Sequence, residues 1–128
     1  MNTFVCQSLL YIFANHCRLN ENNEIVPITG NNFQELFSRE KIIFSQKPES
    51  KSGNIFFNQS LSIVYPYSDV TILQQLTNSH LILKIQKTDG SYYFWGSLEP
   101  YNPVQSEIKT EAGTVEISFF RQSHIVEF

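Results

Sequence analysis

Two cysteines and three histidines are the residues of this sequence that could hold a transition metal. Cys17 directly follows His16, whereas Cys6, His80 and His124 stand alone along the chain. A structural zinc site draws four ligands from short paired spacings, and the sequence offers no second pair. We therefore expect no metal and no other cofactor. Both cysteines are expected to be reduced and buried as small apolar side chains, because a domain of this length builds a core without a disulfide.

The acidic residues are also poorly placed for catalysis. Glycoside hydrolysis needs two facing carboxylates, but the acids of this chain are scattered. Asp69 precedes an apolar run and is expected to cap a helix, Asp89 is expected in a turn, and Glu99 in a loop beside a proline. The sequence also lacks a nucleophile elbow, a phosphate-binding loop and a dinucleotide-binding glycine motif. It predicts a protein that is not an enzyme.

The strongest local signal lies in residues 79–96, SHLILKIQKTDGSYYFWG. Asp89-Gly90 separates two β-rich runs and predicts a two-residue type I′ turn, in which Thr88 pairs with Ser91. The rest of the pairing follows by counting outward, because the turn of a hairpin determines its register. This register places one set of side chains on one face, Tyr93, Trp95, Lys84 and Ile82, and another set on the opposite face, Leu83, Ile85, Tyr92 and Phe94.

Aromatic residues on both faces of one hairpin need an explanation, because a sheet with one solvated face normally alternates apolar and polar residues. The candidate binding face consists of Tyr93, Trp95, Lys84 and Ile82. Three interpretations are open at this point. The face could lie in the core beneath a helix, form the centre of a subunit interface, or stack on a sugar ring.

The remaining pattern is that of a mainly β domain. Apolar runs, alternating or dense, predict strands at residues 3–13, 24–28, 41–46, 54–65, 104–110, 114–121 and 124–128. A helix is also open for the first of these, although its β-branched and aromatic residues favour a strand. A helical turn is predicted at 33–37. One longer helix is predicted at about 69–78, with an apolar stripe of Ile72, Leu73 and Leu76 and with Asn78 closing its end.

Two connections between strands can be described from composition. A three-residue turn at 111–113, with Gly113 in the left-handed conformation, is expected to join the last long strands. A mobile loop is expected between the strands at 41–46 and 54–65, because this segment has only polar residues, a proline and a glycine and offers little apolar surface to hold it. Its residues are Lys47, Pro48, Glu49, Ser50, Lys51, Ser52 and Gly53.

Composition limits the class of protein further. The 128 residues suffice for one β-rich domain, 1–128, with a single core. The net charge is −3 and the basic residues form no stripe that could neutralise phosphates, so specific nucleic-acid binding is not expected. No apolar run is long enough for a membrane helix. The apolar run at residues 4–14 lacks the flanking residues of a signal peptide, which predicts a protein that is not secreted.

From about residue 41 onward, the order of elements resembles small β-rich proteins encoded among the structural genes of tailed bacteriophages, particularly those that infect Bacteroidetes. The resemblance rests on a hairpin with a polar loop (IIFSQKPESKSGNIFFNQSLSIVYP), a helix, the hairpin LILKIQKTDGSYYFWGS and a closing strand pair that ends TVEISFFRQS. Members of that group look like tail-tube, tail-terminator or neck components, in which a β-sandwich or barrel with one flanking helix assembles as a homo-oligomeric ring. No functional residue transfers with the resemblance, and residues 1–40 lie outside it.

Together these observations predict an antiparallel β-sandwich or partly closed barrel with one short flanking helix at about residues 69–78. The resemblance implies a non-enzymatic virion protein, made in the host cytoplasm, whose partners are copies of itself and other virion proteins. The alternative is a carbohydrate-binding β-sandwich with Tyr93 and Trp95 as its stacking platform. Assembly predicts that these two rings are buried between subunits, whereas sugar binding predicts that they are exposed in a monomer.

Overall fold

A computed structural model describes residues 2–66, 70–111 and 113–123 of the chain. Two sequence predictions fall outside these residues: the helix cap at Asp69 and the last strand at 124–128. The strand predicted at residues 3–13 is confirmed as β1 (Asn2–Phe13).

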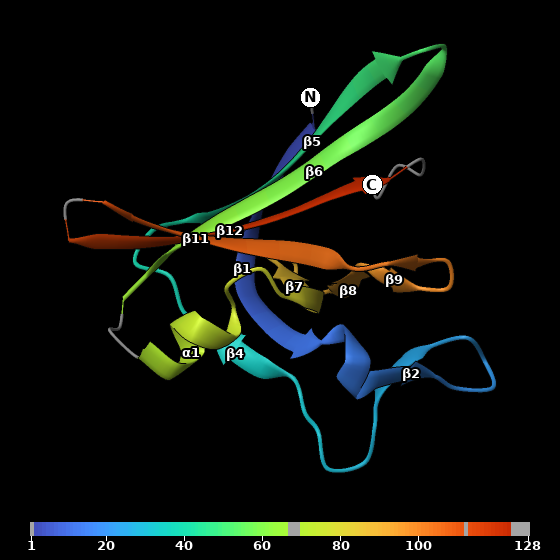
Figure 1. The fold of residues 1–128 in the computed structure, drawn as a ribbon, viewed down its shortest axis with the longest axis horizontal. Helices are drawn as coiled ribbons and strands as arrows, with labels where there is room; N and C mark the ends of the chain where they lie inside the picture. The colour runs from blue at the N-terminus through green and yellow to red at the C-terminus, as the bar shows by residue number, and fades with distance from the viewer. Residues whose placement is uncertain (1, 67–69, 112, 124–128) are drawn as a thin grey trace.

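Six strands close into a barrel (Figure 1). In order around the barrel they are β1 (Asn2–Phe13), β5 (Ile42–Lys51), β6 (Asn54–Tyr65), β12 (Thr114–Ser123), β11 (Val104–Glu111) and β7 (His80–Lys87). The barrel closes because β7 pairs back onto β1, from Ser8 opposite Gln86 to Phe13 opposite Leu81. Two short strands outside the closed ring pair with strands of the barrel: β4 (Gln34–Leu36) with β1, and β8 (Tyr92–Trp95) with β7. The predicted fold class, a mainly β and partly closed barrel with one short helix, is confirmed.

Alternation along the strands explains the core. On β6, Leu61, Ile63 and Tyr65 are buried while Ser60 and Ser62 are exposed, as the sequence predicts. Because successive side chains of a strand point to opposite faces, each strand of the barrel gives one row of residues to the interior. The largest fully buried side chains of that interior are aromatic: Trp95, Phe44 and Phe119.

Helix α1 (Val70–Gln75) packs on the barrel through its apolar stripe, as predicted. Leu76, just after the helix, is fully buried, and Ile72 and Leu73 pack against the same core cluster. Asn78 ends the segment in the left-handed conformation, with φ of 53°, and its N–H donates to the carbonyl of Ser106 at 3.1 Å. The segment after α1 is thereby tied to β11.

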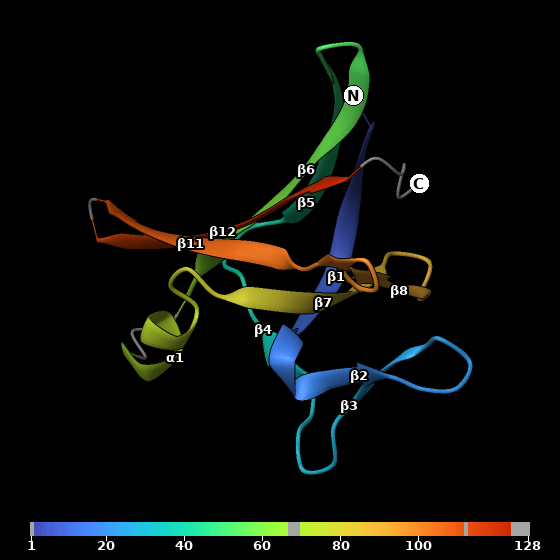
Figure 2. The same cartoon turned by 45° about the vertical axis from the view of Figure 1, so that its right-hand side comes forward.

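A smaller layer covers the outside of β1 and β7. It consists of the short 3-10 helix η1 (Ala14–His16) and a two-stranded sheet of β2 (Cys17–Leu19) and β3 (Ile25–Pro27). Ile12, Ala14 and Cys17 are buried there together with Ile82 of β7. Next to this layer, β9 (Ser97–Leu98) and β10 (Tyr101–Asn102) form a second small hairpin. Figure 2 shows the β2–β3 sheet below β7.

The helical turn predicted at residues 33–37 is wrong. Residues Gln34–Leu36 form β4, which pairs with β1, so that Leu36 lies opposite Leu9 and is buried. The hydroxyl of Tyr11 donates to Oε1 of Gln34 across this pair at 3.0 Å. An apolar spacing of three and four residues looks helical in isolation, but here pairing with a neighbouring strand decides the conformation.

The loop predicted at residues 47–53 is much shorter than expected. Strands β5 and β6 continue through it as a ladder that ends with Lys51 opposite Asn54. Ser52 and Gly53 remain as a two-residue turn with φ of 52° and 81°, the two positive φ angles that a type I′ turn requires. The resulting hairpin projects from the barrel (Figures 1 and 2). The mobility expected for its tip stays a prediction.

The turn between β11 and β12 is also one residue shorter than predicted. Glu111 pairs with Thr114, which leaves two residues between the strands. Gly113 has φ of 79° and therefore takes the left-handed conformation that the sequence predicts for it.

Candidate binding surfaces

The register predicted for the β7–β8 hairpin is wrong by one residue. Leu83 lies opposite Trp95 and Ile85 opposite Tyr93, because the loop between the strands has three residues. Lys87 pairs with Ser91 through an N–H to carbonyl bond of 2.9 Å, and Gly90 takes φ of 89° at the end of the loop. This is the type I turn followed by a left-handed glycine, rather than the type I′ turn.

Asp89 explains why the longer loop forms. Its Oδ1 accepts hydrogen bonds from the hydroxyl of Ser91 at 2.6 Å and from the N–H of Ser91 at 2.8 Å. These bonds hold the pKa of the Asp89 carboxyl below its usual value. Asp89 is thus a turn residue, as expected, but it stabilises a different turn.

The shift in register divides the predicted binding face, because a one-residue slip turns every side chain to the other side of the sheet. Tyr93 and Trp95 point into the barrel. Trp95 is fully buried, and its ring lies 4.9 Å from the ring of Phe44, centroid to centroid. Of the three interpretations of this face, burial in the core is therefore the one that holds for Trp95. The exposed platform of Tyr93 and Trp95 is not formed.

Lys84 and Ile82 point outward, but they do not form a common site. Ile82 is fully buried beneath the β2–β3 layer. Lys84 is half-buried among aromatic rings, with its Nζ 4.7 Å from the ring centroid of Tyr92 and 5.8 Å from that of Phe94. Such distances allow cation–π attraction. The exposed aromatic residues of this hairpin are therefore Tyr92 and Phe94, which the predicted register had placed on the same face as Leu83 and Ile85.

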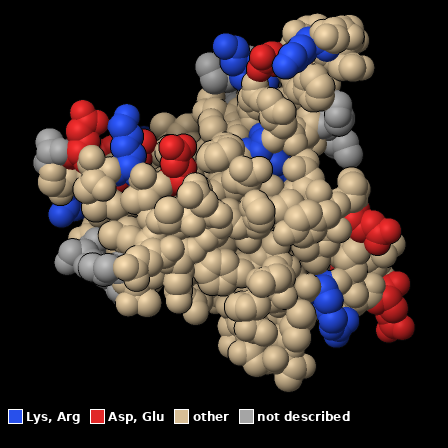
Figure 3. Space-filling view, in the orientation of Figure 1, with Lys and Arg blue, Asp and Glu red and all other residues tan. Residues whose placement is uncertain are grey.

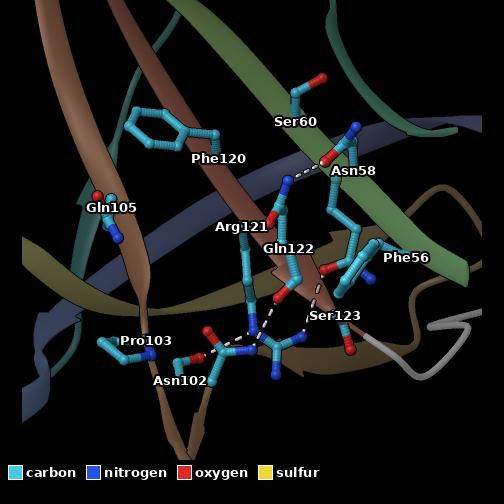
Figure 4. Close-up of a pocket in the computed structure, with 11 residues that line it drawn as sticks. Phe56, Asn58, Ser60, Asn102, Pro103, Gln105, Phe120, Arg121, Gln122 and Ser123 are labelled. Carbon is cyan, nitrogen blue, oxygen red and sulfur yellow. Dashed lines mark hydrogen bonds between the residues drawn. The ribbon is translucent and has the colours of Figure 1, made fainter. Parts of the chain in front are cut away.

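A groove that sequence reasoning did not find lies across β6, β12 and the start of β11 (Figure 4). Its volume is about 700 Å³. Two phenylalanine rings and several amide side chains line it, together with one arginine: Phe56, Asn58, Gln59, Ser60, Asn102, Pro103, Gln105, Phe120, Arg121, Gln122 and Ser123. These residues come from three distant parts of the sequence. Only the strand order could have brought them together, since no local motif marks them.

Hydrogen bonds connect this groove to the core. Nε1 of Trp95 donates to Oε1 of the buried Gln59 at 2.8 Å, and Nη1 of Arg121 donates to the same oxygen at 3.3 Å. Gln59 in turn donates to Oε1 of Gln46 at 3.0 Å. Arg121 also donates from Nε to the carbonyl of Asn102 at 2.8 Å, which fixes the β9–β10 hairpin to β12. The wall of the groove is therefore pre-organised by a network that starts at Trp95.

Neither cysteine lies in the groove. Cys6 belongs to the barrel core and Cys17 to the outer layer, and both are free and buried, as expected. His16 is half-buried against Phe13 and His80 is exposed. Among residues 2–66, 70–111 and 113–123, no three His, Cys, Asp or Glu side chains are grouped so that they could hold a metal ion.

Burial gives the cysteines a measurable pH dependence. It raises the pKa of Cys6 to about 11, and that of Cys17 to about 11, from an ordinary value of 9.0. Because each thiol ionises more readily in the unfolded chain, its contribution to stability is complete below pH 9 and is lost as the pH rises towards 11. We expect urea unfolding to show a steeper loss of stability over this range in the wild type than in Cys6→Ala/Cys17→Ala. Equal slopes would contradict this assignment.

None of the described helices has the length and apolar character needed to span a bilayer. Comparison with protein-family models, with curated proteins and with solved structures found no match to this chain.

Proposed function

We propose that the protein is a non-enzymatic structural subunit of a phage virion, a tail or neck component that assembles with copies of itself into a ring. The virion part of this proposal comes from the resemblance in the order of elements. The self-assembly part rests on the surface of the barrel. The observation that carries it is a patch of exposed apolar side chains and serines on the outside of the barrel, with charged residues at its margin.

This uncharged face lies on the outside of β1, β5, β6 and β12. Val5, Ile43, Ser62 and Ser118 form one row of cross-strand neighbours, and Ser45, Ser60 and Phe120 form the next row. Val5, Ile43 and Phe120 are 38%, 45% and 39% exposed. The serines between them are short, and a shallow pocket lies over Ile43, Ser45, Ser60 and Ser62.

Such a face is suited to contact with another subunit. The centres of protein interfaces are depleted in charged residues, and contiguous exposed apolar groups commonly mark an interaction site. In the view of Figure 3, charged side chains lie over the β5–β6 and β11–β12 hairpins, and others lie near the centre and at the lower right. Assembly through this face would remove the apolar groups from water.

Light scattering coupled to size-exclusion chromatography tests this proposal. We expect the wild type to have a mass several times that of the 14.9 kDa chain. Ile43→Lys would place a charge in the uncharged face and is expected to shift the mass towards the monomer while the fold is retained, since Ile43 is already half exposed. Ile28→Lys is the matched control, because Ile28 is 40% exposed but lies outside this face. A monomeric wild type at every protein concentration would contradict the proposal.

A second candidate function is the binding of a neutral sugar in the groove. Aromatic rings and amide groups are the side chains that stack on sugar rings and bond their hydroxyls, and the groove offers Phe56, Phe120, Asn58, Gln105 and Gln122. This differs from the platform predicted from sequence, since Trp95 now lies behind the groove, joined to it by Gln59. A monomeric protein whose Trp95 fluorescence changes on titration with oligosaccharides would favour this function over assembly.

A further inference from the structure

The β5–β6 and β11–β12 hairpins project from the barrel, and each carries a row of three charged side chains. The signs of the charges in one row are opposite to those in the other. On β5, Lys47, Glu49 and Lys51 occupy alternate positions, and all three side chains are exposed. On β11, the alternate positions are Glu107, Lys109 and Glu111, also exposed. Alternate residues of a strand share a face. The β5 row therefore reads plus, minus, plus, and the β11 row reads minus, plus, minus.

The spacing of the two rows matches as well as their charges. Each step of two residues along a strand is about 6.8 Å, so both rows have the same repeat. Three opposite pairs can then form at once. Because each row reads the same from either end, the match holds for parallel and for antiparallel strands. Opposite charges that face each other across strands stabilise the contact, whereas like charges destabilise it.

Both rows lie on open strand edges in the described part of the chain. The pairing of β5 with β1 ends at Gln46, before the row begins. The pairing of β11 with β7 is limited to Val104 and Gln105, also before the row begins. Pro48 lacks an N–H, which removes one donor from the β5 edge, so the contact would depend on side chains more than on a continuous backbone ladder.

The charges of these rows are largely unused within one molecule. Within residues 2–66, 70–111 and 113–123, one ion pair involves these rows. It joins Lys109 to Glu111 of the same row at 3.9 Å, and both side chains are more than 70% exposed. Glu49 accepts a hydrogen bond from Nδ2 of Asn58 and is held by it on the hairpin surface. Glu116 of β12 lies opposite Lys109 and adds a further negative charge beside the β11 row.

We propose that the Lys47-Glu49-Lys51 row of one copy docks against the Glu107-Lys109-Glu111 row of the next copy. The two hairpins leave the barrel in different directions (Figures 1 and 2). The contact therefore joins two different surfaces. A contact of this kind gives a ring when the rotation between copies closes and an open filament when it does not. This inference rests on the proposed self-assembly and adds the two charge rows to the uncharged face as surfaces that would meet in it.

Charge reversal tests the contact. Lys47→Glu/Lys51→Glu makes both rows predominantly negative, and Glu107→Lys/Glu111→Lys makes both predominantly positive. Each variant alone is expected to raise the dissociation constant about tenfold or more, because like charges then face each other. Glu21→Lys/Glu24→Lys is the control for net charge, since it changes two exposed acids between β2 and β3. Circular dichroism and thermal unfolding of each variant show whether the barrel remains folded.

Restoration is the decisive part of the experiment. In the variant with all four reversals the β5 row is wholly negative and the β11 row is wholly positive. All three pairs are then opposite in charge again, so this variant is expected to assemble. A mixture of the two double variants should also assemble, because the reversed rows of the two variants are complementary and their unchanged rows are complementary as well. The wild-type oligomer should lose mass as salt is raised, since the screening length falls from about 10 Å at 0.1 M to about 3 Å at 1 M.

The outcomes separate this inference from the proposed function. A wild type that assembles but is insensitive to both double variants would overturn the docking of these rows and leave self-assembly standing. A wild type whose mass stops at two copies would overturn the head-to-tail arrangement. A wild type that is monomeric at low salt would overturn self-assembly itself, and this inference with it. Loss in both double variants with recovery in the quadruple variant would support it.

Discussion

Replacing Trp95 with alanine is expected to lower the free energy of unfolding by about 3–5 kcal/mol, the usual cost of removing a large aromatic side chain from a core. Trp95 is fully buried, its ring packs on Phe44, and its indole N–H donates to Gln59. The change would leave a cavity in the barrel and remove one bond from the network behind the groove. Urea unfolding followed by circular dichroism measures the loss.

Two further variants make this prediction specific. Tyr92→Ala removes an aromatic ring from the same strand, but Tyr92 is 50% exposed, so the expected loss is below about 1 kcal/mol. Trp95→Phe keeps an aromatic ring but removes the donor to Gln59, and its expected cost is intermediate. If Trp95→Ala and Tyr92→Ala had the same effect, the observed register of the β7–β8 hairpin would be wrong. Any oligomer should be lost in Trp95→Ala only together with the fold.

Gly96→Ala is expected to destabilise the protein by about 3 kcal/mol, because strained backbone and overpacking each cost about 1–3 kcal/mol. Gly96 has φ of 109°, which side chains rarely adopt. A Cβ there would lie 3.0 Å from Cδ1 of Ile82 and 3.3 Å from the carbonyl oxygen of Leu81. The strand β8 can therefore turn into the β9–β10 hairpin only because this position has no side chain.

Gly90→Ala is the matched control for Gly96→Ala. Gly90 also has a positive φ, 89°, but a Cβ at this position would have nothing within 4 Å. Its expected cost is only the backbone strain, about 1 kcal/mol. Thermal or urea unfolding of the two variants therefore separates strain from close packing. Equal losses would show that the approach of Leu81 and Ile82 to Gly96 is looser than described.

Alternation along the strands was sufficient to predict most of the fold. The buried row of Leu61, Ile63 and Tyr65, the helix with its apolar stripe and the left-handed Gly113 all follow from patterns within one element. These features depend on local periodicity and on turn chemistry, and both can be recognised from a few neighbouring residues. The closure of the barrel does not follow from such local patterns, because the pairing of β7 with β1 joins residues that are far apart in the chain.

The errors at the site have a common physical cause. The predicted binding face of Tyr93, Trp95, Lys84 and Ile82 depended on a turn of two residues, and the bonds that Asp89 makes to Ser91 stabilise one of three. One residue was enough to move Trp95 from a surface to the core. For residues 47–53, polarity suggested a loop, but a polar strand in a projecting hairpin has the same composition. The charge rows could have been read from the sequence only after both strands were known to extend to their tips.

The proposed head-to-tail joining of barrels through their projecting hairpins predicts a visible arrangement of subunits. Electron microscopy of the purified chain at low ionic strength tests it most directly, because the images show the arrangement of subunits as well as their association. We predict closed rings in which each barrel contacts two neighbours, and their disappearance in Lys47→Glu/Lys51→Glu. Images that contain only separate particles of single-barrel size, at low ionic strength and high protein concentration, would contradict this proposal.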